Sequence, residues 1–89
     1  MDPVYQKIIT LLTMQGIDLE SVIEYKVNEK PYALTYRFII ESYMKASDDA
    51  KLVFLSALEK SQKAGEIGME KFFEGMGKLL LMGSLSTKL

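Results

Sequence analysis

Apolar side chains recur with helical spacing at the start of the chain. The first stripe consists of Val4, Ile8, Leu11 and Leu12. Positions separated in this way share one face of an α-helix. Asp2 suits the N-cap, because its carboxylate accepts hydrogen bonds from free N–H groups of the first turn, and Pro3 suits the first helical position. Gly16 predicts the end of this helix, since glycine adopts the left-handed conformation without strain.

The middle of the chain has two interpretations. Helical spacing is found in two stretches, the first with Leu19, Val22, Ile23 and Val27 and the second with Tyr32, Tyr36, Ile39, Ile40 and Tyr43. The same region is rich in β-branched and aromatic side chains, and Asn28 to Pro31 joins its two parts. This composition is also typical of a β-hairpin. We take two helices as the main prediction and a hairpin over residues 22–40 as the alternative.

Two further helices are expected in the second half of the chain. We expect the first to be capped by Ser47 or Asp48 and to end at Gly65. The second extends from Glu66 to about Met82. Its apolar side holds Met69, Phe72, Phe73, Met76, Leu79 and Leu80. Three glycines lie inside it, Gly68, Gly75 and Gly77. Because each interior glycine costs about 1 kcal/mol relative to alanine, this helix needs tertiary packing to be stable.

These elements predict an all-α fold, a small bundle of four to five short helices. The alternative is an α+β fold with one central β-hairpin at about residues 22–40. A chain of 89 residues is long enough for one hydrophobic core and too short for two. We therefore expect a single helical domain over residues 1–82 and a flexible C-terminal tail over residues 83–89.

The composition argues against several classes of site and partner. The chain has neither cysteine nor histidine, so we expect no metal site of the usual kind, no thiol or imidazole catalyst and no cofactor. Its formal net charge of −1 offers little surplus for phosphates, so nucleic acid is a disfavoured partner. The apolar run from Leu79 to Met82 is far shorter than the roughly 20 residues that span a bilayer. We expect no membrane association and a cytoplasmic location.

Two short motifs resemble catalytic signatures, and neither predicts an enzyme. Ser42 and Lys45 match S-x-x-K, but this pattern is common by chance and its companion motifs are missing. The segment from Gly75 to Lys78 resembles part of a phosphate-binding loop. However, Phe72 stands where that loop needs its first glycine, and Leu79 stands where it needs a hydroxyl. The sequence therefore predicts no catalytic residue.

Two groups of side chains are candidates for binding surfaces. The first, which we expect to contact a partner, consists of Tyr32, Tyr36, Arg37 and Tyr43. Tyrosine and arginine are enriched at binding hot spots because they combine a large contact area with a polar group. The second, which we expect to join copies of the chain, consists of Met69, Phe72, Phe73, Met76 and Leu80. For both groups the competing interpretation is packing inside the core.

Together these features favour a small non-enzymatic protein–protein interaction module. We expect an adaptor, regulator or inhibitor that acts on a larger partner protein of unknown identity, as a homodimer or higher homo-oligomer. An origin in a phage or other mobile element is an expectation from size alone. The first alternative is a helix-turn-helix-like DNA-binding regulator, with its two helices around Asn28 to Pro31. The second is a carrier of a small apolar ligand.

Overall fold

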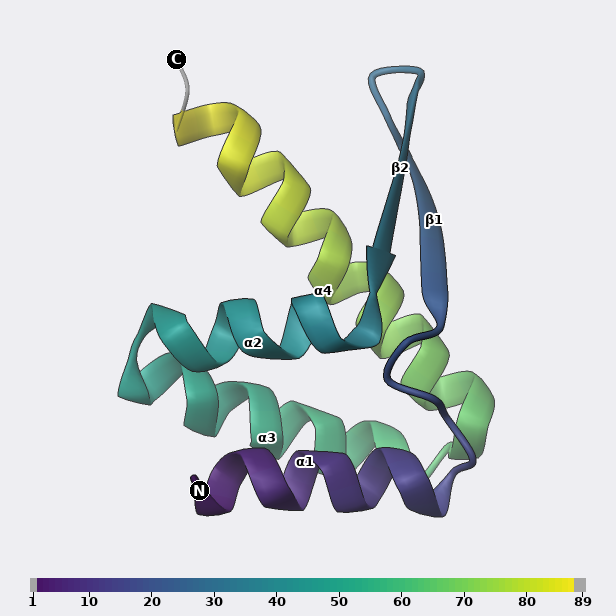
Figure 1. Ribbon diagram of the computed structural model, residues 1–89, viewed down its shortest axis with the longest axis vertical. Coiled ribbons are helices and arrows are strands. Elements are labelled where there is room, and N and C mark those ends of the chain that lie inside the picture. Colours follow the sequence, from purple (N-terminus) through teal and green to yellow (C-terminus); the bar gives the residue numbers. More distant parts are fainter. Residues whose placement is uncertain (1, 88–89) are drawn as a thin grey trace.

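Four helices and one two-stranded hairpin follow one another within residues 2–87, which our computed structural model describes (Figure 1). For residues 84–87 only the backbone is described. The elements are α1 (Pro3–Met14), β1 (Val22–Val27), β2 (Lys30–Thr35), α2 (Tyr36–Ala46), α3 (Asp48–Gln62) and α4 (Gly65–Thr87). The fold is therefore mostly helical with one antiparallel hairpin.

The local signals at the helix ends act as the sequence predicts. The Asp2 carboxylate accepts a hydrogen bond from the Val4 N–H at 2.9 Å and begins α1. The Ser47 hydroxyl accepts one from the Ala50 N–H at 3.0 Å and begins α3. Gly16 follows α1 with a φ of 72°, and Gly65, the first residue of α4, has a φ of 75°. Glycine adopts such angles without steric cost because it has no Cβ atom.

The helix predicted over Leu19–Val27 is wrong, and the helix predicted from Tyr32 onward begins only at Tyr36, where α2 starts. The hairpin alternative is confirmed. Strands β1 and β2 pair antiparallel, with Tyr25 opposite Tyr32. Asn28 and Glu29 form the turn with φ values of 54° and 68°. Two consecutive left-handed residues match the twist of a tight hairpin. The hairpin is shorter than expected, because residues 36–40 belong to α2.

Thr35 marks the boundary between the hairpin and α2. Its hydroxyl accepts a hydrogen bond from the Phe38 N–H at 3.0 Å and caps the helix. An isolated two-stranded hairpin is marginally stable in water, so the strands depend on contacts with the helices. Tyr25 provides such a contact, since it is 5% exposed and its hydroxyl donates to the Phe73 carbonyl at 2.8 Å. Tertiary contacts thus select the hairpin over the helix.

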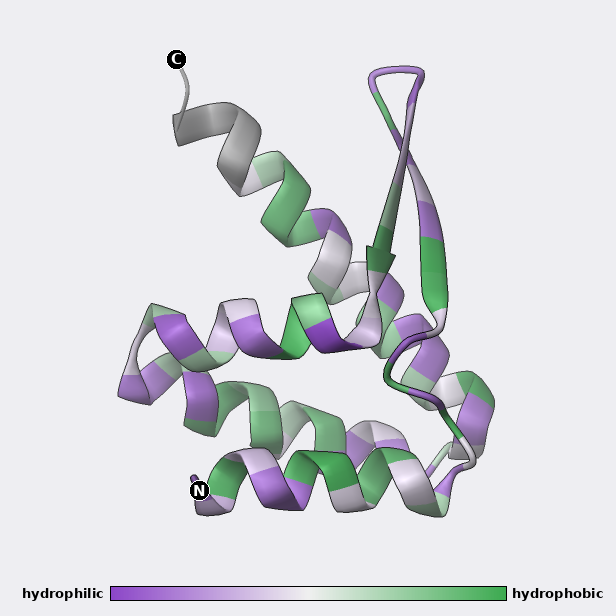
Figure 2. Cartoon of the chain, viewed as in Figure 1, coloured by the Kyte–Doolittle hydropathy of each residue, from purple (hydrophilic) through white to green (hydrophobic). Residues whose placement is uncertain are grey.

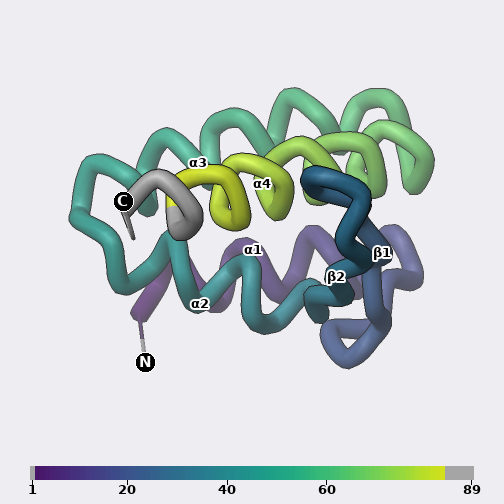
Figure 3. Tube along the Cα trace, turned by 90° about the horizontal axis from the view of Figure 1, so that it is seen from above, coloured from purple at the N-terminus to yellow at the C-terminus, as the bar shows by residue number. Residues whose placement is uncertain are grey.

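The four helices surround one core, with α1 and α2 on one side and α3 and α4 on the other (Figure 3). The buried core residues are Ile8, Leu11, Leu12, Tyr36, Ile39, Ile40, Phe54, Leu58, Met69 and Phe73. Phe54 lies among three aromatic rings, those of Tyr43, Phe72 and Phe73, at centroid distances of 5.0, 5.1 and 5.7 Å. The core therefore depends on α3 and α4 as much as on the N-terminal elements.

Helix α4 continues to Thr87, beyond Met82, where the sequence suggested that it would end. Residues 83–87 of the expected tail are thus helical, and Lys88 and Leu89 lie outside the described residues. Figure 1 shows that the end of α4 and the tip of the hairpin both project from the helices and diverge from each other. Across residues 2–87 we find no helix that combines the length and the apolar character needed to cross a membrane.

Candidate functional site

The tyrosines expected to form one partner-binding surface lie in different environments. Tyr36 is 5% exposed and packs edge-on against Phe73, with ring centroids 4.8 Å apart. Tyr43 is half-buried, and its hydroxyl donates to the Met76 carbonyl at 3.0 Å. Tyr32 lies on β2, opposite Tyr25 of β1. Tyr36 and Tyr43 therefore help to hold α2 against α4, and the three rings do not form one exposed surface.

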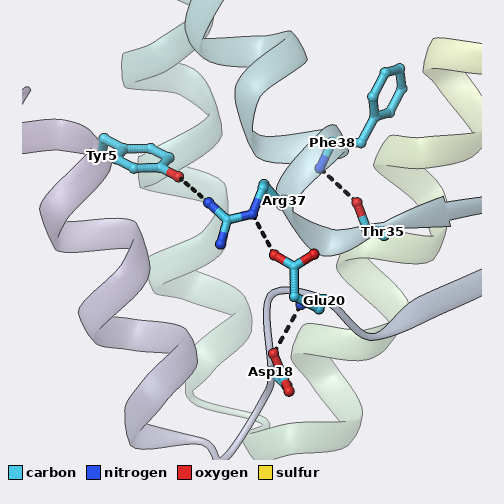
Figure 4. A network of polar contacts seen from close by, with 6 residues as sticks. All are labelled: Tyr5, Asp18, Glu20, Thr35, Arg37 and Phe38. Atoms are coloured by element: carbon cyan, nitrogen blue, oxygen red, sulfur yellow. Dashed lines mark hydrogen bonds and ion pairs between the residues drawn. The ribbon is translucent and has the colours of Figure 1, made fainter.

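Arg37, the remaining member of that predicted group, forms contacts within the chain (Figure 4). Its Nε pairs with the Glu20 carboxylate, and its Nη1 lies 3.5 Å from the Tyr5 hydroxyl. Its backbone N–H donates to the Leu19 carbonyl at 3.0 Å. The Asp18 carboxylate in turn accepts from the Glu20 N–H at 2.9 Å. The Arg37 side chain thus attaches the loop before β1 to α2.

The five residues predicted to join copies of the chain divide between the core and its edge. Met69 and Phe73 are fully buried inside one copy, so in this fold neither can contact a second one. Phe72, Met76 and Leu80 are half-buried and pack against the same core. The sequence pattern identified the apolar side of α4, and Met69 and Phe73 follow the competing interpretation, packing inside the core. Helices α2 and α3 and strand β1 cover most of this side instead.

A different part of α4 is exposed and apolar. Leu79, Leu80, Leu81 and Met82 are consecutive. Since successive helical residues are rotated by about 100°, these four point to all sides of the helix. Leu80 packs on the core, whereas Leu79 is 60% exposed and Met82 is 52% exposed. Figure 2 shows the hydrophobic colour on this projecting part of α4. We call residues 79–82 the α4 apolar turn.

The α4 apolar turn was visible in the sequence as a run of four consecutive apolar residues, equal in length to the run from Leu52 to Leu55 in α3. From the sequence, this run argues only against a membrane span, and Leu79 is expected on the core side with Leu80. The signal that could have identified the exposed turn is the length of the run. A helix packed on one side has an apolar stripe of roughly 100° or somewhat more, and four consecutive apolar residues cover the whole circumference.

The residues of the two candidate motifs and the acidic side chains take ordinary structural positions. Within residues 2–83, no group of three or more carboxylates is arranged to hold a metal ion. In the S-x-x-K motif, the Ser42 hydroxyl donates to the Phe38 carbonyl at 2.8 Å, as a helical serine commonly does. Burial raises the pKa of Tyr25 to about 12, and the nearby Glu74 carboxylate adds to the shift. Tyr25 therefore remains a protonated hydrogen-bond donor near neutral pH.

No family model matches this chain, and comparison with characterised proteins and with solved structures gives no significant match. Its function therefore has to be argued from its own surfaces.

Proposed function

We propose that this chain is a non-enzymatic protein-binding module that docks on a larger protein through the α4 apolar turn. The observation that supports the proposal is the exposure of Leu79 and Met82 on a helix that is apolar on all sides at that point. Helices with this character are normally buried. Full burial of one such side chain stabilises a complex by about 1.5–3 kcal/mol.

The two alternatives from the sequence have less support. The DNA-binding hypothesis needs two helices around Asn28 to Pro31, where the chain forms a hairpin. Arg37, which would lie on the DNA-reading helix, pairs with Glu20. For the ligand carrier, the described grooves are open, and each has charged side chains in its lining, among them Lys26, Glu41 and Lys60. An apolar ligand would gain little by binding there.

The first prediction is that Leu79→Glu abolishes partner binding and leaves the fold intact. A carboxylate placed at the centre of an apolar contact must be desolvated, which we expect to weaken binding by at least about ten-fold. Since Leu79 is 60% exposed, the free energy of unfolding should change by no more than about 0.5 kcal/mol. Quantitative affinity capture from the native host, with urea unfolding of both proteins, tests this prediction.

Ile67→Glu is the matched control. Ile67 lies on the same helix and is 68% exposed, but it is outside the α4 apolar turn. Proteins retained by the wild type and by this control, and lost with Leu79→Glu, identify the partner. If the partner is a second copy of the chain, the molecular mass of the protein in solution shows this directly. Equal retention by all three proteins would refute the proposal.

A further inference from the structure

The outer edge of β1 is unpaired and lies beside an acidic groove. In a hairpin with a two-residue turn, Val27 and Lys30 exchange backbone hydrogen bonds. From there, hydrogen-bonded pairs of residues alternate with pairs that are not hydrogen-bonded to each other. The backbone groups of Val22, Glu24 and Lys26 therefore point away from β2. Within the described residues the sheet has two strands, so nothing pairs with these groups. Such an edge is a template for another strand.

The groove at this edge has a volume of about 450 Å³. It is lined by Val22, Ile23 and Glu24 of β1, Tyr36 of α2, and Glu70 and Glu74 of α4. No residue of β2 lines it, so it lies on the open side of β1. None of its three carboxylates forms an ion pair within residues 2–83. The groove therefore carries negative charge that no ion pair offsets within residues 2–83, although Lys71 and Lys78 lie one turn from Glu74 on α4.

Spacing along α4 adds to this negative charge. Glu66, Glu70 and Glu74 follow one another at intervals of four residues and form one stripe on the helix. Like charges at this interval repel each other and destabilise a helix. A bound cation would relieve this repulsion.

Tyr36 provides a second, independent indication of a ligand. The residue is 5% exposed, and its hydroxyl has no hydrogen-bond partner among the described residues. Every fully buried polar side-chain atom in the described part of the chain has a hydrogen-bond partner. Because the Tyr36 hydroxyl has none, it is not fully buried, and it must remain open to the groove. Burial raises the pKa of Tyr36, and Glu70, Glu66 and Glu74 raise it further. The hydroxyl is thus a free acceptor in a negative field.

We propose that an extended, basic segment of a partner protein adds to the free edge of β1 and places its lysine or arginine side chains in the acidic groove. Strand addition satisfies the outward backbone groups of Val22, Glu24 and Lys26. Because side chains alternate along a strand, every second residue of the segment faces Glu70 and Glu74. This surface is separate from the α4 apolar turn, so the inference goes beyond the proposed function.

A basic segment fits this edge better than the other occupants. Pairing with β1 of a second copy would bring Glu24 and the α4 carboxylates of both copies close together, where they would repel. Nucleic acid would place phosphates against the same carboxylates. A free polyamine would satisfy the charges but leave the backbone edge unpaired. Only an extended basic peptide satisfies both the charges and the edge.

The test uses a short, fluorescent, acetylated peptide in which lysine alternates with threonine. We expect the double variant Glu70→Gln and Glu74→Gln to weaken its binding by about ten-fold in an anisotropy titration. The matched control, Glu41→Gln with Glu59→Gln, removes the same charge elsewhere and should change affinity by no more than about two-fold. Leu79→Glu should have no effect, which separates this inference from the proposed function. Equal losses in both double variants would contradict it.

The backbone part of the proposal has its own test. The same peptide, N-methylated on the residues that face β1, should lose binding because it cannot pair with the strand. In the wild-type protein, the bound parent peptide should slow amide exchange at Val22, Glu24 and Lys26. Undiminished binding of the methylated peptide, binding of spermine as tight as that of the peptide, or unchanged exchange would each overturn strand addition.

Tyr36→Phe gives a separate prediction for the free hydroxyl. The variant should bind the peptide a few-fold more weakly, because an acceptor for the lysine ammonium is removed. Its resistance to urea should be unchanged, because the hydroxyl makes no hydrogen bond inside the protein. Tyr43→Phe is the control: it loses the bond to the Met76 carbonyl, so it should lower stability and leave peptide affinity unchanged. If Tyr36→Phe lowered stability and left peptide affinity unchanged, the Tyr36 hydroxyl would not face the groove.

Discussion

Gly77→Ala will loosen the hairpin from the helices and destabilise the protein by about 2 kcal/mol. A Cβ atom at this position would overlap the Tyr25 hydroxyl oxygen and lie 2.6 Å from Tyr25 Cζ and 3.1 Å from Ile39 Cδ1. The rigid Tyr25 ring would have to move, and its hydrogen bond to the Phe73 carbonyl would break. These costs exceed the gain of about 1 kcal/mol in helix propensity.

Gly75→Ala is the control for this prediction. It lies two residues earlier on the same helix, and nothing lies within 4 Å of the added Cβ. This variant should be more stable than the wild type by about 0.5–1 kcal/mol, since alanine favours the helix. Urea unfolding of both variants measures their changes in stability, which should have opposite signs. Stabilisation by Gly77→Ala would mean that Tyr25 does not pack against α4.

A double variant isolates the contact between the hairpin and α4. Tyr25→Phe alone should cost about 1 kcal/mol, because it removes the bond to the Phe73 carbonyl. Combined with Gly77→Ala, which breaks the same bond, it should cost less than the sum of the two single changes. Strict additivity would show that the two residues act separately.

Phe54→Ala will have the largest effect on stability, a loss of about 3–5 kcal/mol. The side chain is 0% exposed and lies among the rings of Tyr43, Phe72 and Phe73. Its removal leaves a cavity between α3 and α4 and ends three aromatic contacts. Since domains of ordinary size are stable by about 5–15 kcal/mol, this loss is a large part of the total. We expect a much lower urea midpoint.

Leu52→Ala is the control on the same helix. Leu52 is two residues away and 57% exposed, so its truncation should change stability by no more than about 0.5 kcal/mol. A loss comparable to that of Phe54→Ala would mean that the outer side of α3 is buried in solution, for instance against a second copy.

Several features of this protein were determined by the sequence alone. They are the ones marked by local signals, such as the Asp2 and Pro3 start of α1, the Ser47 cap of α3, and the glycine stops at Gly16 and Gly65. Such signals act through hydrogen bonds and backbone angles within a few residues, so they can be recognised without a tertiary structure. The apolar side of α4 was recognised in the same way, from its period.

Only the tertiary structure decided between helix and hairpin for the middle of the chain. Val22–Val27 fits both periods, and the choice depends on Tyr25 reaching the Phe73 carbonyl 48 residues away. Tertiary contacts also decided which apolar residues are covered: Phe73 is buried whereas Leu79 is exposed, although both belong to the same apolar pattern. Whether a side chain is buried depends on which elements pack against it. A pattern along one element does not contain that information.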